Sequence, residues 1–292
     1  MAVSIVIPAY NEEGAIKAVV TALLSVMNGS GLPYEVIVVD DGSRDKTAAI
    51  ARTIPGITFL HHRHNKGYGA ALKTGIRHAH HDIICITDAD GTYPNERIPE
   101  LVHHLEAGEF DMVVGARTGE NVSIPLVRRP AKWALRQLAT LVSGEKIPDL
   151  NSGLRLFRRD VALRFFNILP DKFSFTTTIT LALMSNQYLV DFVPINYFAR
   201  VGQSKIRPIH DTINFTQLVL RITLYFAPLK IFLPLSVFLL LVGIVWAVFS
   251  LTVLGQLADV STIVIVMTAF QVAVIGMLAE LINRRLPNYY RE

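Results

Sequence analysis

Cysteine and charge are both scarce in this chain of 292 residues. The single cysteine, Cys85, excludes a disulfide framework and a zinc site built from thiolates, and it suits a reducing compartment. Charged residues make up 18% of the sequence, against roughly 25% in an ordinary soluble domain. Much of the deficit lies between Ile231 and Ala279, where Asp259 is the only charged residue. The chain therefore consists of a polar first part and an apolar last part.

The sequence also has no block of basic residues. Its 28 lysines and arginines exceed its 24 aspartates and glutamates by a small margin, for a formal net charge of +4. Chains that bind nucleic acid carry their basic residues in clusters, so this composition argues against nucleic acid as a partner. It permits contact with an anionic membrane surface.

Two long apolar runs, Ile231–Leu254 and Thr262–Ile282, dominate the last part of the chain. A helix needs about 20 predominantly apolar residues to cross the hydrocarbon core of a bilayer, and each run is long enough. We therefore predict a hairpin of two transmembrane helices within residues 231–283. The alternative is a buried helical hairpin in a soluble core, where two consecutive runs of this length are rare.

The flanking charges predict which way the hairpin faces. Residues 255–261, the link between the two runs, contain no lysine or arginine, whereas Arg284 and Arg285 follow the second run. By the positive-inside rule, both ends of the hairpin face the cytoplasm, with residues 284–292 as a cytoplasmic tail. Met1–Pro8 has neither the basic start nor the long apolar core of a signal peptide. We expect an integral protein of the cytoplasmic membrane, or of an equivalent inner or endoplasmic-reticulum membrane, with its polar part facing the cytoplasm.

The segment just before the hairpin, residues 208–230, mixes apolar and polar positions. Within Asp211–Phe226, apolar residues such as Ile213 and Leu218 recur among polar ones. This pattern is typical of a helix that lies in the headgroup layer of a membrane. We predict an amphipathic interfacial region here, between a globular domain over residues 1–207 and the hairpin.

The globular part alternates short runs rich in β-branched residues with helical patterns. The candidate strands are Val3–Ile7, Glu35–Val39, Thr58–His61, Asp82–Thr87 and Met112–Gly115. The candidate helices between them are Glu12–Met27, Lys46–Arg52, Gly69–Ala79 and Arg97–Ala107. Apolar strands separated by helices predict an α/β, Rossmann-like domain with a mainly parallel sheet covered on both faces. Ligands of such sheets bind beyond the carboxyl ends of the strands.

Polar residues collect at three of these strand ends. Residues 8–13 read PAYNEE, residues 40–43 read DDGS and residues 88–91 read DADG. Taken singly, each has a structural explanation, because Asn11 and Ser43 are good helix N-caps and Asp-Gly suits a turn. Together, three acidic loops at one sheet edge would repel each other unless a cation or hydrogen-bond donors lie between them.

The chemistry of these loops indicates a site for a metal ion and a diphosphate. Carboxylate oxygens favour Mg²⁺ or Mn²⁺, and Mg²⁺ is usually shared between one or two carboxylates and substrate phosphates. Neither the phosphate loop GxxxxGK[ST] nor the dinucleotide fingerprint GxGxxG occurs in the chain. Histidines gather at residues 61–64 and 78–81 without the spacing of a zinc site, and we predict that they lie in solvated loops.

Four segments in this order, IVIPAYNEE, VVDDGSRDKT, NKGYGAALKTG and ITDADGTYP, resemble the GT-A catalytic domain of glycosyltransferase family 2. The later segments GART, DLNSGLRLFRR and GQSKI narrow the resemblance to the polyprenyl-phosphate sugar transferases, the group with dolichyl-phosphate mannose synthase and bactoprenyl-phosphate glucosyltransferases. The resemblance covers about residues 3–207 and implies a GT-A fold. The QxxRW signature of processive polysaccharide synthases is absent.

The resemblance implies a donor side at the first strand ends. It assigns the nucleotide-sugar to Pro8, Ala9, Tyr10, Glu12, Asp40, Asp41, Asp88 and Ala89. We further predict that the loop of residues 200–205, which carries Arg200 and Lys205, closes on the donor diphosphate. It places Mg²⁺ or Mn²⁺ on Asp88 and on the catalytic Asp90, where the ion would neutralise charge on the departing nucleoside diphosphate. Some mannose synthases carry a glutamine metal ligand two residues after the second aspartate, whereas this chain reads Gly91-Thr92-Tyr93.

The resemblance also implies an acceptor side that binds the phosphate of a polyprenyl lipid. Its candidate residues are Arg117, Arg128 and Arg129; the alternative for the last two is a role as interfacial basic residues. Asp149 stands where other members of the family carry a catalytic base. An ionised phosphate hardly needs a base, so the alternatives are that Asp149 orients Arg155 or caps the turn at residues 151–153.

These observations predict a membrane-bound inverting glycosyltransferase that moves a sugar from a UDP- or GDP-sugar to undecaprenyl or dolichyl phosphate. One alternative is transfer to a hydroxyl of a glycolipid or diacylglycerol, with Asp149 as the base. A nucleotidyltransferase would carry a glycine-rich N-terminal loop that is absent here. A non-enzymatic, membrane-anchored nucleotide-sugar-binding protein would leave three acidic strand ends unexplained. The sequence leaves open the sugar, the base, the polyprenol and whether the chain forms a homo-oligomer.

Overall fold

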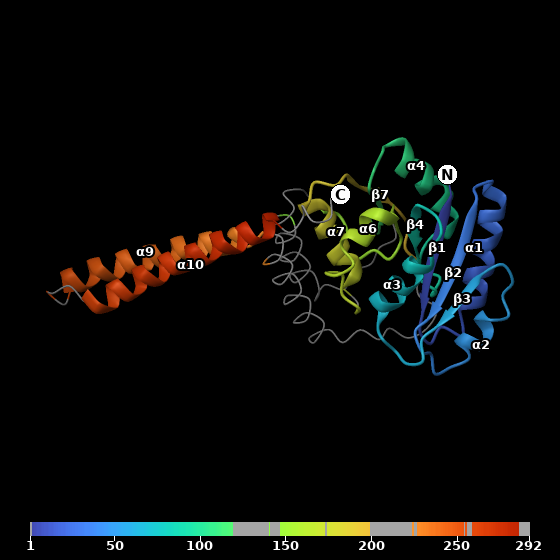
Figure 1. The fold of residues 1–292 in the computed structure, drawn as a ribbon, viewed down its shortest axis with the longest axis horizontal. Coiled ribbons are helices and arrows are strands. Elements are labelled where there is room, and N and C mark those ends of the chain that lie inside the picture. The colour runs from blue at the N-terminus through green and yellow to red at the C-terminus, as the bar shows by residue number, and fades with distance from the viewer. Residues whose placement is uncertain are drawn as a thin grey trace. The chain divides into compact units, whose positions relative to one another are not determined.

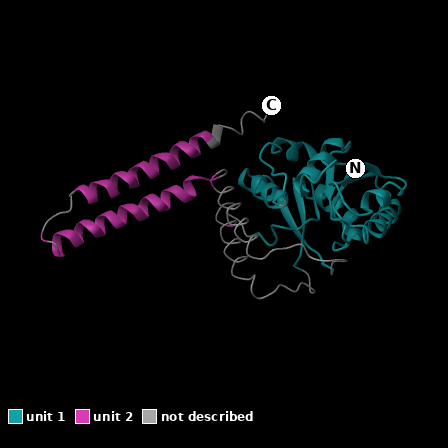
Figure 2. Cartoon of the chain, turned by 90° about the horizontal axis from the view of Figure 1, so that it is seen from below, with its two compact units in different colours: residues 1–137, 145–215 teal, residues 138–144, 216–292 magenta. Residues whose placement is uncertain are grey.

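The computed structural model describes residues 2–118, 140, 147–172, 174–198, 224, 227–253, 255 and 259–285. The chain divides into two compact units (Figure 2). The first unit comprises residues 1–137 and 145–215, and the second comprises residues 138–144 and 216–292. Strands and helices alternate in the first unit, whereas the described part of the second is helical.

Seven strands of the described chain form one sheet in the first unit (Figure 1). They are β1 (Val3–Ala9), β2 (Tyr34–Asp40), β3 (Thr58–His61), β4 (Ile83–Ile86), β5 (Met112–Ala116), β6 (Arg155–Arg158) and β7 (Val190–Pro194). Their order across the sheet is β3-β2-β1-β4-β6-β5-β7. Strand β6 pairs antiparallel with β4 and β5, and the other neighbours are parallel. The predicted mainly parallel sheet is confirmed.

The helices of the first unit lie between these strands in the sequence. They are α1 (Ile16–Ser30), α2 (Thr47–Ala51), α3 (Tyr68–His78), the 3-10 turn η1 (Asn95–Arg97), α4 (Ile98–Ala107), α6 (Arg159–Arg164) and α7 (Phe175–Ser185). The five strands predicted up to residue 116 are all present, with ends that differ by at most two residues. Helix α1 begins four residues later than predicted, because the loop after β1 bonds to a neighbouring loop instead of starting the helix.

The core lies on both faces of the sheet. Strand β1 is buried along its whole length, and its residues Val3, Ile5 and Ile7 share a hydrophobic cluster with apolar residues of α1 and α4. Gly75 of α3 lies against Val6, which points to the opposite face. Burial on both faces explains why the strands read as continuous apolar runs.

The second unit contains two long helices, α9 (Leu229–Val253) and α10 (Asp259–Arg285), that pack side by side (Figures 1 and 2). Both are long and apolar enough to cross a membrane. Small residues lie where they touch: a Cβ atom at Gly276 would come within 2.5 Å of the Phe232 Cβ atom. Glycine at this position allows the two helix backbones to approach closely.

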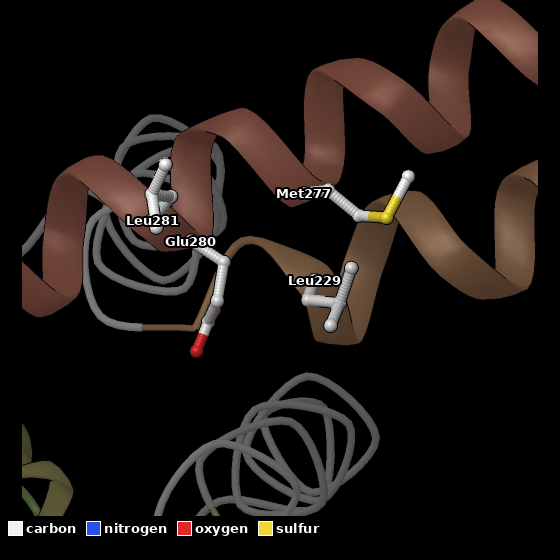
Figure 3. Close-up of a pocket in the computed structure, with 4 residues that line it drawn as sticks. All are labelled: Leu229, Met277, Glu280 and Leu281. Atoms are coloured by element: carbon white, nitrogen blue, oxygen red, sulfur yellow. The ribbon is translucent and has the colours of Figure 1, made fainter.

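An open pocket lies between the start of α9 and the end of α10 (Figure 3). Its lining consists of three apolar side chains and one carboxylate, namely Leu229, Met277, Leu281 and Glu280. The pocket belongs to the hairpin alone and contains none of the residues predicted for the donor or acceptor side.

Candidate functional site

The sheet topology brings the predicted loops to one edge. Ala9 pairs with Asp40, and Asp40 pairs with His61, so the carboxyl ends of β1, β2 and β3 lie level with one another. Strands β4 and β5 run in the same direction as β1, whereas β6 runs against them. The loop that precedes β6, residues 149–154, therefore reaches the same edge as the loops that follow β4 and β5.

The loops after β1 and β2 are tied to each other by hydrogen bonds. The Asn11 amide donates to Ser43 Oγ at 2.9 Å, the Arg44 amide donates to Asn11 Oδ1 at 2.8 Å, and the Glu12 amide donates to Thr47 Oγ1 at 2.8 Å. Asn11 has a φ of 55°, a left-handed conformation that asparagine tolerates. The interpretation of Asn11 and Ser43 as helix N-caps is wrong, because both side chains bond across the loops instead.

The two aspartates that end β2 are buried and face histidines. Asp40 accepts a hydrogen bond from His61 Nδ1 at 2.7 Å and bonds to the Ser43 hydroxyl. Asp41 pairs with His62 Nδ1 at 2.7 Å and accepts the Lys66 and Gly67 amides at 2.9 and 2.8 Å. The prediction that these histidines lie in solvated loops is wrong for His62, which is buried. The hydrogen-bond donors that the crowded carboxylates require are thus partly histidines.

Asp88 and Asp90 follow β4 and have different surroundings. The Tyr68 hydroxyl donates to Asp88 Oδ1 at 3.0 Å, whereas the buried Asp90 accepts the hydroxyl and amide of Thr92 at 2.7 and 3.1 Å. Thr92 stands two residues after Asp90, where some mannose synthases carry the glutamine ligand. Its hydroxyl bonds to the aspartate itself.

The oxygen donors of this loop fit a divalent cation that is completed by a substrate. No group of three or more His, Cys, Asp or Glu residues within the described part of the chain could hold a metal by itself. Mg²⁺ commonly takes one or two carboxylates together with phosphate oxygens. Asp88 and Asp90 supply that number of carboxylates, so the donor set suits a cation shared with a diphosphate.

Arg117, directly after β5, forms the best-defined ion pair of the described site. Its Nε and Nη2 atoms donate to the two carboxylate oxygens of Asp149 at 2.7 and 2.9 Å, and its backbone amide adds a third bond at 3.1 Å. Burial by itself would raise the pKa of Asp149, but the hydrogen bonds and charge of Arg117 lower it to about 2. Burial by itself would lower the pKa of Arg117, but the hydrogen bonds to Asp149 have the larger effect, so the pKa of Arg117 is raised. Both groups are charged at neutral pH.

Asp149 also accepts the Asn151 amide at 3.1 Å, so the predicted capping of the 151–153 turn is present. Asp149 does not orient Arg155, the other predicted alternative. The Arg155 guanidinium is fully buried and donates to the carbonyls of Ser152 and Thr176 and to the Thr180 hydroxyl. Burial lowers the Arg155 pKa to about 10, which leaves it charged at neutral pH. Arg155 therefore fixes the backbone of the loop before β6.

Two tyrosines complete this edge, and neither was among the site residues predicted from the sequence. Tyr93 accepts the Gly153 amide through its hydroxyl at 2.6 Å, and its ring contacts that of Tyr197. The Arg117 guanidinium lies over the Tyr197 ring at 5.2 Å from its centre. Tyr93 follows the DADG motif by two residues, and this closeness could have identified it as a site residue. Tyr197 lies far from every predicted motif in the sequence, so no sequence signal pointed to it.

The remaining predicted residues divide into two sets. Pro8 and Ala9 are the last two residues of β1, Tyr10 and Glu12 lie half-buried in the loop that follows, and Ala89 is buried between the two aspartates. The others lie outside the described residues: Arg128, Arg129, Arg200 and Lys205.

Comparisons with known proteins agree with this geometry. Residues 4–166 match glycosyl transferase family 2, and residues 227–284 match the GtrB C-terminal hairpin. The hairpin match and the two apolar helices together indicate a membrane protein.

Two of the relatives are named as sugar transferases with a polyprenyl phosphate in their names. A dolichyl-phosphate hexose transferase of Haloferax volcanii is 29% identical over 211 residues, which cover 70% of this chain and 86% of that protein. An undecaprenyl-phosphate 4-deoxy-4-formamido-L-arabinose transferase of Pectobacterium atrosepticum is 32% identical over 164 residues, or 54% of this chain. The match spans 49% of that relative, about half of its length.

Among solved structures, the glucosyl-3-phosphoglycerate synthase of Mycobacterium tuberculosis, in complex with Mn²⁺, UDP and phosphoglyceric acid, is similar with a TM-score of 0.60. The similarity covers 76% of this chain and 77% of that one at 22% identity, and it confirms the predicted GT-A-like α/β fold. The sequence match covers more than half of the chain and extends from β1 through the three acidic loops and Arg117 to β6. This chain belongs to glycosyl transferase family 2.

Proposed function

We propose that this chain is a membrane-bound inverting glycosyltransferase that moves a sugar from a nucleotide-sugar to a polyprenyl phosphate. The observation that carries the proposal is the composition of the sheet edge. The carboxylates of Asp88 and Asp90 follow β4, and the Arg117 guanidinium follows β5, with only β6 between the two strands. One edge thus offers a place for a cation with a diphosphate and, beside it, a fixed positive charge for a second anion.

The donor side lies at the ends of β1, β2 and β4. Pro8, Ala9, Tyr10, Glu12, Asp40, Asp41 and Ala89 would hold the base and the ribose, and Arg200 and Lys205 would close on the diphosphate. Asp88 and Asp90 would hold Mg²⁺ or Mn²⁺, which as a Lewis acid would neutralise charge on the leaving nucleoside diphosphate. The bonds from His61 and His62 keep Asp40 and Asp41 oriented before the donor binds.

The acceptor side centres on Arg117, with Arg128 and Arg129 as further candidates. Asp149 holds the Arg117 guanidinium through two parallel bonds, a geometry that fixes the direction of the charge. The lipid phosphate oxygen would attack the anomeric carbon from the face opposite the leaving group. The new bond forms as the bond to the nucleoside diphosphate breaks, which inverts the configuration.

The alternative of a lipid hydroxyl acceptor requires Asp149 to accept a proton. The Asp149 carboxylate already accepts four hydrogen bonds, and its pKa of about 2 makes it a weak base. A phosphate oxygen is ionised and needs no base. The geometry therefore favours a phosphate acceptor, with Asp149 as the residue that positions Arg117.

Each segment of the chain has a role in the proposed function. Residues 1–207 would form the catalytic domain, residues 208–230 the interfacial region, and residues 231–283 the transmembrane pair, at about 231–254 and 262–282, followed by the tail at 284–292. The catalytic domain would face the cytoplasm, where nucleotide-sugars occur. The membrane would hold the active site close to its lipid acceptor.

A substrate panel tests the proposal. Purified protein with Mg²⁺ or Mn²⁺ would be offered UDP- and GDP-sugars with undecaprenyl phosphate, dolichyl phosphate and the unphosphorylated polyprenols. We expect transfer from one donor class to a polyprenyl phosphate and none to the alcohol. Equal transfer to the alcohol and the phosphate would contradict the acceptor assignment, and no transfer with any pair would contradict the function.

Single cysteines test the orientation. The native Cys85 is buried within β4, and burial raises the pKa of its thiol, so it gives little background labelling. In intact cells, Gln256→Cys should react with an impermeant thiol reagent, whereas Asn288→Cys should react only after permeabilisation. The opposite pattern would invert the proposed orientation, and labelling of both from outside would mean a single crossing.

A further inference from the structure

Tyr93 is a buried side chain of the site to which the proposed function gives no role. It lies on the loop after β4 with only 5% of its surface exposed. Its hydroxyl accepts the Gly153 amide at 2.6 Å, and its ring meets the Tyr197 ring edge-on, with 5.3 Å between the ring centres. The two contacts use different parts of the side chain and lead to different sides of the site.

The hydroxyl contact leads to Asp88. Gly153 lies so close to the Asp88 carboxylate that a Cβ atom on this glycine would come within 2.7 Å of Oδ2. On the other oxygen, Oδ1, Asp88 accepts the Tyr68 hydroxyl at 3.0 Å. The carboxylate therefore lies between a tyrosine hydroxyl and the Gly153 backbone, and a shift of Gly153 changes the space that Asp88 occupies.

The ring contact leads to Arg117. The Arg117 guanidinium lies over the Tyr197 ring at 5.2 Å from its centre, and the edge of the Tyr93 ring contacts Tyr197. Arg117 is thus held by two different contacts: Asp149 accepts two hydrogen bonds from the guanidinium, and the guanidinium lies over the face of the Tyr197 ring. The rotamer of Tyr197, supported by Tyr93, limits how far the guanidinium can tilt.

We propose that Tyr93 is a positioning residue that sets Asp88 through the Gly153 amide and Arg117 through the Tyr197 ring. It keeps a fixed separation between the group that binds the donor and the group that binds the lipid phosphate. The inference rests on the proposed function for the roles of Asp88 and Arg117.

Because the two contacts are separable, two variants distinguish them. Tyr93→Phe keeps the ring and removes the acceptor of the Gly153 amide, so the Kd for UDP or GDP should rise about fivefold to tenfold. The KM for lipid phosphate should change less than twofold. Tyr197→Leu removes the ring under Arg117, so the KM for lipid phosphate should rise about threefold to tenfold with the nucleotide Kd unchanged.

Tyr34→Phe is the matched control. The Tyr34 hydroxyl donates to Asn28 Oδ1 at 2.7 Å, and Tyr34 begins β2 at the opposite edge of the sheet. This variant also loses one tyrosine hydrogen bond, yet it should leave both constants within twofold of the unmodified protein. The proposal is overturned if Tyr93→Phe behaves like Tyr34→Phe, or if it raises the nucleotide Kd and the lipid KM equally.

Hydrogen exchange without ligands tests the same contact independently of the proposed function. In Tyr93→Phe the Gly153 amide should exchange at least about tenfold faster, while the amides of residues 190–193 in β7 keep their rates. Unchanged exchange at Gly153 would overturn the proposal even in a protein that binds nucleotide. If the unmodified protein binds neither UDP nor GDP, the proposed function fails, and the exchange result still decides whether Tyr93 holds Gly153.

Discussion

The two units of this protein distribute polar and apolar side chains in opposite ways. In the first unit, which we propose to be catalytic and name the catalytic unit, charged groups such as Asp40, Asp41 and Arg155 are buried and hydrogen-bonded. In the hairpin, large apolar side chains face outward, with Phe238, Val245 and Phe270 exposed by 60%, 67% and 64%. Small residues lie where the two helices touch: Gly243 faces Ile265 and Val266, and Gly276 faces Phe232.

The difference follows from the solvent that each unit meets. In water, burial of apolar surface stabilises the fold, so the catalytic unit has an apolar core. It can bury a charged group only where that group has hydrogen-bond or ion-pair partners. Lipid tails are as apolar as leucine, so the hairpin gains little by hiding its large side chains and associates through close backbone packing. Loss of a polar partner should therefore impair the activity or stability of the catalytic unit. Addition of a methyl group between the helices should lower the stability of the hairpin.

The largest effect is expected at the donor side of the catalytic unit. Asp90→Asn is nearly isosteric and removes one carboxylate of the cation site, so transfer should fall by a factor of about 10³. Steady-state rates with saturating Mn²⁺, compared with nucleoside diphosphate binding, measure the loss. Asp171→Asn, which changes an exposed aspartate paired with Lys73, is the control and should stay active. Full activity of Asp90→Asn, or turnover undiminished in excess EDTA, would exclude the proposed cation site.

The next effect is expected at the acceptor side. Arg117→Ala removes a charge-assisted contact to the lipid phosphate, so the KM for that lipid should rise about tenfold to a hundredfold. The Kd for the donor nucleotide should change little. Arg164→Ala, which removes an exposed arginine from α6, is the matched control. A parallel rise in both constants would mean that Arg117 acts on the structure of the site rather than on the acceptor.

The Arg117–Asp149 pair should also make stability depend on pH in the acidic range. The pKa of Asp149 in the folded protein, about 2, lies below its ordinary value of 3.8. The pair therefore stabilises the fold above about pH 4 and loses this contribution as the pH falls towards 2. Asp149→Asn should thus cost roughly 2 kcal/mol at pH 7 and much less at pH 2.

Unfolding by urea in detergent, followed by circular dichroism at several pH values, measures this difference. Asp160→Asn alters an exposed ion pair with Arg164, whose O–N distance is 3.4 Å, and should change stability little at any pH. A cost of Asp149→Asn that stays constant from pH 7 to pH 2 would contradict the assigned pKa.

The smallest effect is expected in the hairpin. Gly276→Ala places a Cβ atom within 2.5 Å of Phe232, so the helices must separate, at a cost of about 1–2 kcal/mol in hairpin stability. Nucleotide binding by the catalytic unit should not change. Gly243→Ala, whose Cβ atom would come no closer than 3.2 Å to Ile265 and Val266, is the matched control and should cost less. Thermal unfolding in detergent measures both, and equal losses would show that close packing is not what Gly276 provides.

Much of the fold could be read from the sequence because its signals are local. The strands β1, β2, β4 and β5 contain continuous apolar runs, and the two spans are defined by length and composition alone. Strands β6 and β7 were not predicted. Strand β6 (Arg155–Arg158) contains two arginines in four residues, and only the register against β4 and β5 makes it a central strand.

Local sequence patterns were enough to predict the chemical groups of the protein: acidic residues at the strand ends, an arginine after β5 and an apolar hairpin, because each depends on residues that are neighbours in the chain. The tertiary structure alone decided the pairing. Asp149 meets Arg117, not Arg155, and His61 and His62 meet Asp40 and Asp41. These contacts arise because parallel pairing aligns the strand ends and the reversed β6 returns its loop to the same edge, a long-range register that no local pattern encodes.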